Sequence, residues 1–159
     1  MKRLFNTRIL ILTIFLLLGA IPVAATERPF ALNGKGTAFF ILDEAGNATG
    51  AKVIAAGTAT HLGLWTITGS VTYNPPDANG VIRSSGTATV TAANGDTLEL
   101  AIEGTLDAAT FTDHGTYYFV RGTGQFRRVS GGGNFVVTGN TPNGGFELTM
   151  VGNIKFFLR

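Results

Sequence analysis

The stretch TLELAIEGTLD, residues 97–107, alternates apolar and polar side chains over most of its length. Its apolar positions are Leu98, Leu100, Ile102 and Leu106, and its polar positions are Thr97, Glu99, Glu103 and Thr105. Successive side chains of a β-strand point to opposite faces, so a period of two is typical of a half-buried strand. The same alternation recurs in FELTMVGNIKF, residues 146–156. These segments predict an all-β protein.

Turn signals separate further strands on either side of this stretch. Asn94-Gly95, directly before it, predicts a tight hairpin because both residue types tolerate positive φ. Similar signals occur at residues 43–47, 74–80, 107–115 and 140–145. Strands are therefore predicted at 35–42, 51–60, 63–73, 81–92, 97–106, 115–121, 129–138 and 146–157. Short hairpins joining about eight strands indicate an antiparallel barrel or sandwich.

Glycines inside the strands favour the barrel over the sandwich. They are Gly57, Gly63, Gly69, Gly86, Gly104, Gly139 and Gly152. Glycine weakens a flat sheet but permits the strong coiling that a small barrel needs. Closure also removes the exposed edges that a meander would leave. We predict an up-and-down antiparallel barrel of eight strands.

The N-terminal segment has the pattern of a secretory signal peptide. Lys2, Arg3 and Arg8 precede an apolar run from residue 9 to residue 21, and Val23-Ala24-Ala25 resembles a cleavage site. The run is shorter than the roughly 20 residues of a membrane-spanning helix. We expect residues 1–25 to be removed, residues 26–159 to form a single domain, and the product to be secreted or periplasmic without stable membrane insertion.

Composition argues against several function classes. Without residues 1–25 the chain has nine basic and ten acidic residues, so it lacks the basic excess of a nucleic-acid-binding protein. It has no cysteine, which excludes disulfides and a thiol nucleophile. The two histidines, His61 and His114, lack metal-ligand spacing, and no serine has the partners of a hydrolase triad. We expect neither a metal nor a cofactor.

The glycine-rich stretch RGTGQFRRVSGGGNF, residues 121–135, raises the question of a phosphate loop. The position where a dinucleotide-binding fingerprint needs its third glycine is Arg127, and strands flank the segment on both sides. We therefore interpret it as a tight connection between strands. Phe126 is predicted to turn inward, Gly122 or Gly124 to adopt φ > 0, and Arg127 and Arg128 to be solvated.

This segment, extended to residue 137, resembles the GGTGRFxGAxG-like motif of the eight-stranded barrel shared by allene oxide cyclases and plant dirigent proteins. In those barrels one further strand follows, here 146–157. The stretches GTATHLGLWTITG (57–69) and VTAANGDTLELAIEGTLD (90–107) resemble segments of uncharacterised secreted bacterial proteins that we associate with the same barrel. The resemblance covers about half of the chain after residue 25 and implies the fold more than the activity.

Cyclases of this kind depend on a carboxylate inside an apolar cavity, and the sequence offers no obvious one. Glu99, Glu103 and Glu147 fall on the polar faces of their strands. Asp43, Asp77, Asp96, Asp107 and Asp113 fall in predicted turns. Burial is what usually raises a carboxyl pKa for acid–base work, so the case for an enzyme is weak.

Large rings on both faces of several strands indicate an apolar lumen or a subunit contact. They occur at Phe39-Phe40, Tyr117-Tyr118-Phe119 and Phe156-Phe157. The residues predicted to line a ligand site are Trp65, Tyr117, Phe119 and Phe126. Our leading hypothesis is a non-enzymatic barrel that binds a small apolar ligand or forms a homo-oligomer. The alternatives are a cofactor-free cyclase or isomerase of the allene oxide cyclase type, and a structural surface protein.

Overall fold

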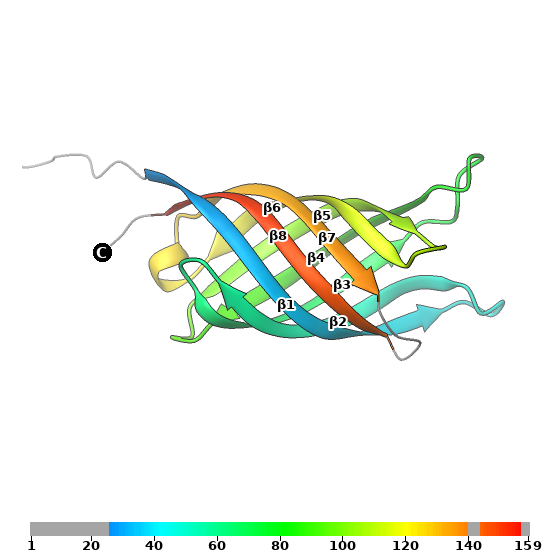
Figure 1. Cartoon of the computed structure of the whole chain (residues 1–159), viewed down its shortest axis with the longest axis horizontal. Coiled ribbons are helices and arrows are strands. Elements are labelled where there is room, and N and C mark those ends of the chain that lie inside the picture. The colour runs from blue at the N-terminus through cyan, green and yellow to red at the C-terminus, as the bar shows by residue number, and fades with distance from the viewer. Residues whose placement is uncertain (1–25, 140–143, 157–159) are drawn as a thin grey trace, which may run out of the picture.

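A computed structural model describes residues 26–139 and 144–156. Its strands are β1 (Thr26–Leu42), β2 (Ala48–Ala59), β3 (Gly63–Tyr73), β4 (Ile82–Ala92), β5 (Thr97–Asp107), β6 (Thr112–Gly122), β7 (Ser130–Gly139) and β8 (Gly145–Phe156). A short 3-10 helix, η1 (Gly124–Phe126), connects β6 to β7. Every strand pairs with its sequence neighbours, and β8 pairs with β1, so the sheet is a closed antiparallel barrel (Figure 1).

The predicted fold class is therefore confirmed, and most strand bounds agree within three residues. The exception is β1, which begins at Thr26 instead of residue 35. The added residues pair with β8 from Thr26↔Phe156 onward and complete the closure of the barrel. Pro29 obscured this segment because proline is rare inside paired strands. The predicted signal peptide and Phe157 lie outside the described residues.

Alternate residues of every strand face the interior of the barrel. One half of this interior is filled by large rings. Phe30 lies edge-on to Phe119, with centroids 5.2 Å apart, and Phe119 is 5.5 Å from Tyr117. Phe126 packs against Phe156 at 5.3 Å. We call this half the plugged end, because η1 covers it (Figure 1). Both described chain ends also lie there.

The opposite half, which we call the mouth, is bounded by the turns at 43–47, 74–81 and 108–111. Several inward-facing side chains are only half-buried here, so solvent reaches them; they are Ala38, Val53, Val71, Tyr73, Leu106 and Val137. Others at this end, such as Ala51 and Phe146, are buried. The inward-facing side chains of the plugged end, by contrast, are mostly buried. Among the described residues, no helix has the length and apolarity needed to cross a membrane.

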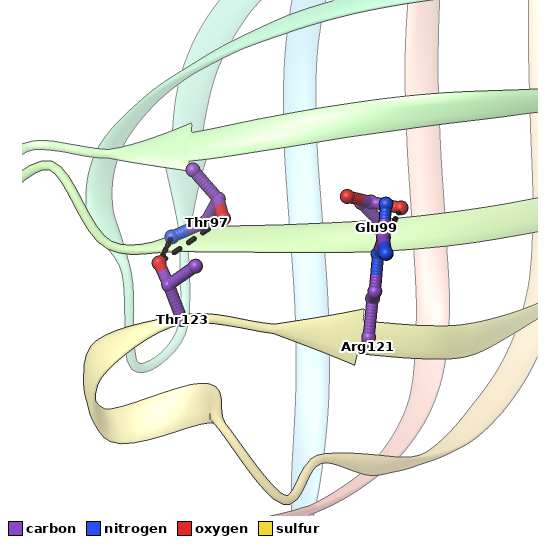
Figure 2. Close-up of polar contacts among 4 residues, drawn as sticks. All are labelled: Thr97, Glu99, Arg121 and Thr123. Carbon is purple, nitrogen blue, oxygen red and sulfur yellow. Dashed lines mark hydrogen bonds and ion pairs between the residues drawn. The ribbon is translucent and has the colours of Figure 1, made fainter.

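The glycine-rich connection has the structural role that the sequence predicted. Phe126 is fully buried, Gly124 has φ +54°, and Arg127 and Arg128 are exposed. The backbone N–H of Thr97 donates to Thr123 Oγ1 at 2.8 Å, which fixes the start of the connection to β5 (Figure 2). The turn before β5 has positive φ at Gly95 only, so Asn94 does not use the left-handed conformation.

Candidate functional site

Among the described residues, polar side chains face the interior of the mouth from three strands: Tyr73 on β3, Ser84 on β4 and Asp113 on β6. Tyr73 lies directly opposite Ser84 in the register, and Ser84 lies opposite Gly104 of β5. Asp113 lies opposite Leu106, two residues along β5 from Gly104. The three side chains therefore converge across four adjacent strands, and we call them the polar trio.

A hydrogen bond joins two members of the trio. Ser84 Oγ donates to Asp113 Oδ1 at 2.8 Å, and the two residues are only 3% and 6% exposed. Gly104 makes this contact possible. A Cβ built on Gly104 would lie 2.8 Å from Asp113 Oδ1 and 2.8 Å from the Phe135 ring. Because Gly104 has no side chain, the Asp113 carboxyl group fits beside Ser84.

Burial changes the acidity of this site. Loss of solvation raises the pKa of the Asp113 carboxyl, and the bond from Ser84 and the proximity of His114 only partly oppose that rise. Burial, with a contribution from the charge of Asp113, raises the pKa of the Tyr73 phenol to about 12. Tyr73 therefore keeps its proton at neutral pH and remains a hydrogen-bond donor.

The chemistry of the trio suits one polar group on an otherwise apolar molecule. Asp113 can accept a hydrogen bond from a hydroxyl, or donate one when protonated, and Tyr73 can donate to an oxygen. The neighbouring inward-facing side chains are the apolar Val71, Leu106 and Val137. A carboxyl group with raised pKa in apolar surroundings is also the arrangement that acid–base catalysis uses.

The prediction that Asp113 lies in a turn was wrong. It is the second residue of β6 and faces inward. The sequence Asp113-His114-Gly115 reads as a turn, but Gly115 is an inward position of the strand that lacks a side chain. Continuing the alternation of Tyr117 and Phe119 backward through this glycine would have revealed Asp113. Glu99, Glu103 and Glu147 lie on the polar faces of their strands as predicted, and these faces point outward.

The structure places the four predicted ligand-lining residues in the interior. Trp65, Tyr117, Phe119 and Phe126 are all buried, and all lie deeper than the polar trio, toward the plugged end. Tyr117 connects the two regions, because it faces inward from β6 four residues beyond Asp113. Trp65 Nε1 and the Tyr117 hydroxyl are buried without a hydrogen-bond partner in the described chain. Contact of these four residues with a ligand remains a prediction.

The two histidines occupy separate places. His61 lies in the turn after β2, where its Nε2 is 3.0 Å from the Pro29 carbonyl and its ring is 5.4 Å from Phe156. His114 faces outward on β6. Within residues 26–139 and 144–156, no three acidic, histidine or cysteine side chains gather as metal ligands would.

Comparison with known proteins supports the fold. No family model and no curated protein matches the sequence. Among solved structures, the barrel is similar to "the pterocarpan synthase dirigent protein GePTS1", with a TM-score of 0.50 and 15% sequence identity. The likeness covers 86% of this chain and 88% of the dirigent protein. The chain therefore has a dirigent-like fold, an eight-stranded antiparallel barrel closed by its first and last strands.

Proposed function

We propose that this barrel binds a small, largely apolar molecule through the mouth, without catalysing a reaction on it. The ligand carries a hydroxyl or similar group that meets the polar trio. The observation that carries the proposal is the hydrogen-bonded pair Ser84–Asp113, buried among apolar side chains. A buried carboxyl group is costly to desolvate, so its presence at a solvent-reachable mouth favours a binding role.

The difference in burial along the barrel supports the same proposal. Buried rings fill the plugged end, while Val71, Leu106 and Val137 near the trio are only half-buried. Ligand sites are typically apolar hollows with a few convergent polar groups. The dirigent fold of the similar structure is consistent with a guiding or binding role, although 15% identity transfers no ligand.

A second candidate function is a cofactor-free cyclase or isomerase of the allene oxide cyclase type. One observation favours it: burial raises the pKa of Asp113, and Tyr73 remains a phenol donor across the mouth. Asp113 would then exchange a proton with the substrate while Tyr73 orients a substrate oxygen.

Native mass spectrometry of purified protein tests the proposal, followed by titration of apolar alcohols and phenols monitored through Trp65 emission. We expect a stoichiometric small molecule to co-purify or to bind. Asp113→Ala should weaken binding by about tenfold or more, since it removes the buried hydrogen-bonding group that meets the ligand. Glu44→Gln changes an exposed carboxyl in the turn after β1 and should leave binding unchanged.

Each result of these measurements selects one function. Chemical conversion of a bound ligand that stops in Asp113→Asn would establish the enzyme. If no molecule co-purifies and no alcohol or phenol changes Trp65 emission, the alternative of a structural surface protein would be favoured. The same mass spectra report the number of subunits, and we propose export after removal of residues 1–25, with a homo-oligomer as the state to test.

A further inference from the structure

The outer face of the barrel carries a second candidate site, independent of the mouth. Two shallow hollows of about 390 and 420 Å³ lie over strands β2 to β6. They share Ser70 and Thr87 as lining residues, so the two hollows adjoin each other. We call them together the outer trough.

The strand register defines the direction of this trough. Lys52, Ser70, Thr87, Ala101 and Tyr118 are paired in succession across β2, β3, β4, β5 and β6. Adjacent strands are about 4.8 Å apart, so this row extends for about 19 Å. The three central residues have short side chains, whereas Lys52 and Tyr118 at the two ends are long. Small side chains therefore form the middle of the row, and a long side chain flanks it at each end.

Hydroxyl groups line the middle and the sides of the trough. They belong to Thr68, Ser70, Thr72, Ser85, Thr87 and Thr89. Tyr118 is 52% exposed at one end and presents an aromatic ring beside these hydroxyls. Glu103 is exposed on one flank. Glu99 on the opposite flank is neutralised by Arg121, whose Nε lies 2.7 Å from Glu99 Oε2 (Figure 2).

These features discriminate between classes of ligand. A peptide strand cannot extend the sheet here, because closure leaves the barrel without a free edge. A nucleic acid would need several cations, and among the described residues that line the trough Lys52 is the cation. An apolar molecule would have to desolvate the hydroxyl rows. A neutral chain of hydroxylated rings can form hydrogen bonds with the hydroxyls and the Glu103 carboxylate, and can pack against the Tyr118 ring.

We propose that the outer trough binds a neutral, linear oligosaccharide. A sugar ring packs its C–H face against Tyr118, and the following units lie along the row toward Lys52. Sugar hydroxyls exchange hydrogen bonds with Thr87, Ser70 and Glu103. The length of the row suits several units, so longer oligosaccharides bind more tightly than disaccharides.

Isothermal titration of the folded protein with defined sugars tests this site. The probes are cellohexaose, xylohexaose and mannohexaose, with the matching disaccharides, and a heparin hexasaccharide and hexauridylate as charged comparators. We expect at least one neutral hexasaccharide to bind. Tyr118→Ala and Ala101→Lys should each weaken its binding by about tenfold or more, by removing the ring and by filling the floor. Tyr118→Phe should retain binding through the ring, and Val136→Ala, at an exposed apolar position on β7, is the matched control.

Several results would overturn the proposal. One is that none of the three neutral hexasaccharides binds at millimolar concentration. Another is binding that is unchanged in both Tyr118→Ala and Ala101→Lys while circular dichroism shows both variants folded. Tighter binding of a charged comparator would assign the trough to a polyanion. Sedimentation showing self-association that Tyr118→Ala abolishes would assign it to a second copy of the chain.

Discussion

Asp113 and Gly124 show how single residues determine the chemistry of the mouth and the turn at the plugged end. Asp113 brings a buried carboxyl group to the mouth, where Ser84 holds it in one orientation. Gly124 allows the chain to turn beneath the plugged end, because a Cβ there would collide with the Asp96 carboxylate. In both cases a neighbouring turn or strand supplies the partner, so the effect of a substitution can be measured against a local control.

Replacing Asp113 with asparagine should change the dependence of stability on pH. The folded-state pKa of Asp113 is raised, so folding favours the protonated form. The stability this group contributes is present below the ordinary carboxyl pKa and is lost as pH rises through the raised value. Thermal melts between pH 3 and pH 8 should show the wild type losing stability relative to Asp113→Asn as pH increases. Asp43, Asp77 and Asp107 have lowered pKa values, and they affect the pH dependence of both proteins equally. Their contribution therefore cancels when the stability of Asp113→Asn is subtracted from that of the wild type. A difference independent of pH would contradict the assignment.

The glycine-rich connection should be sensitive to substitution at Gly124 and Phe126 but not at Arg127. Gly124→Ala should lower the free energy of unfolding by about 1 kcal/mol or more, because its φ is positive and Asp96 blocks the space. Phe126→Ala removes a fully buried ring and should cost about 3–5 kcal/mol. Arg127→Ala, at an exposed position, should stay within about 0.5 kcal/mol. Urea denaturation of the three variants gives the ordering. Stabilisation by added phosphate that disappears in Arg127→Ala would instead indicate an anion site.

At the scale of the strands, opposed glycines allow the sheet to close on itself. Inward-facing glycines lie directly opposite each other in Gly34↔Gly57, Gly104↔Gly115 and Gly133↔Gly152. At each pair, a Cβ on either strand would approach the partner strand's backbone too closely. Such points permit the strong local coiling of a small barrel. The in-strand glycines that favoured a barrel in the sequence thus have a direct structural reason.

Gly115→Ala should therefore destabilise the barrel by about 1–3 kcal/mol, as overpacking in a well-packed site does. Its Cβ would meet the Glu103 carbonyl oxygen and lie 2.5 Å from the Gly104 Cα. Thr116→Ala, the next residue on the same strand, faces outward and serves as the control. Both free energies of unfolding can be measured by chemical denaturation. If both substitutions changed the free energy of unfolding equally, β6 would have to shift enough to accommodate the added Cβ at residue 115.

For the whole molecule, the sequence predicted more of the fold than of the site. Alternation in residues 97–107 and 146–156 is a local property, so strands and hairpins followed from it directly. The polar trio depends on three strands meeting around a closed barrel, which no local pattern describes. Asp113 was misassigned because Gly115 interrupts the alternation of β6. Trp65, Tyr117, Phe119 and Phe126 were predicted to line a ligand site, and the structure buries all four. Their inward direction and their depth in the barrel depend on how the strands pair, tilt and stagger.

Barrel closure depends on the first residues of β1, which the sequence pattern missed. Residues 26–31 pair with β8 from Phe156 to Val151, and Phe30 is buried among the aromatic rings of the plugged end. A chain that begins at Thr26, the expected product of signal cleavage, keeps all of these contacts. A chain that begins at Leu32 loses them and leaves part of β8 as an unpaired edge, which promotes aggregation.

We expect the protein beginning at Thr26 to unfold cooperatively and remain monodisperse. The version beginning at Leu32 should melt at a clearly lower temperature, because it loses a buried ring, worth about 3–5 kcal/mol, in addition to the strand pairing. Differential scanning calorimetry and light scattering measure the two effects. Glu27→Gln in the longer chain is the control, because it removes only the exposed ion pair with Lys155. Similar melting temperatures for the two chains would mean that β1 residues 26–31 contribute little to closure. Intact-mass analysis of exported protein checks separately that the natural chain begins at Thr26, and retention of Met1 would contradict cleavage there.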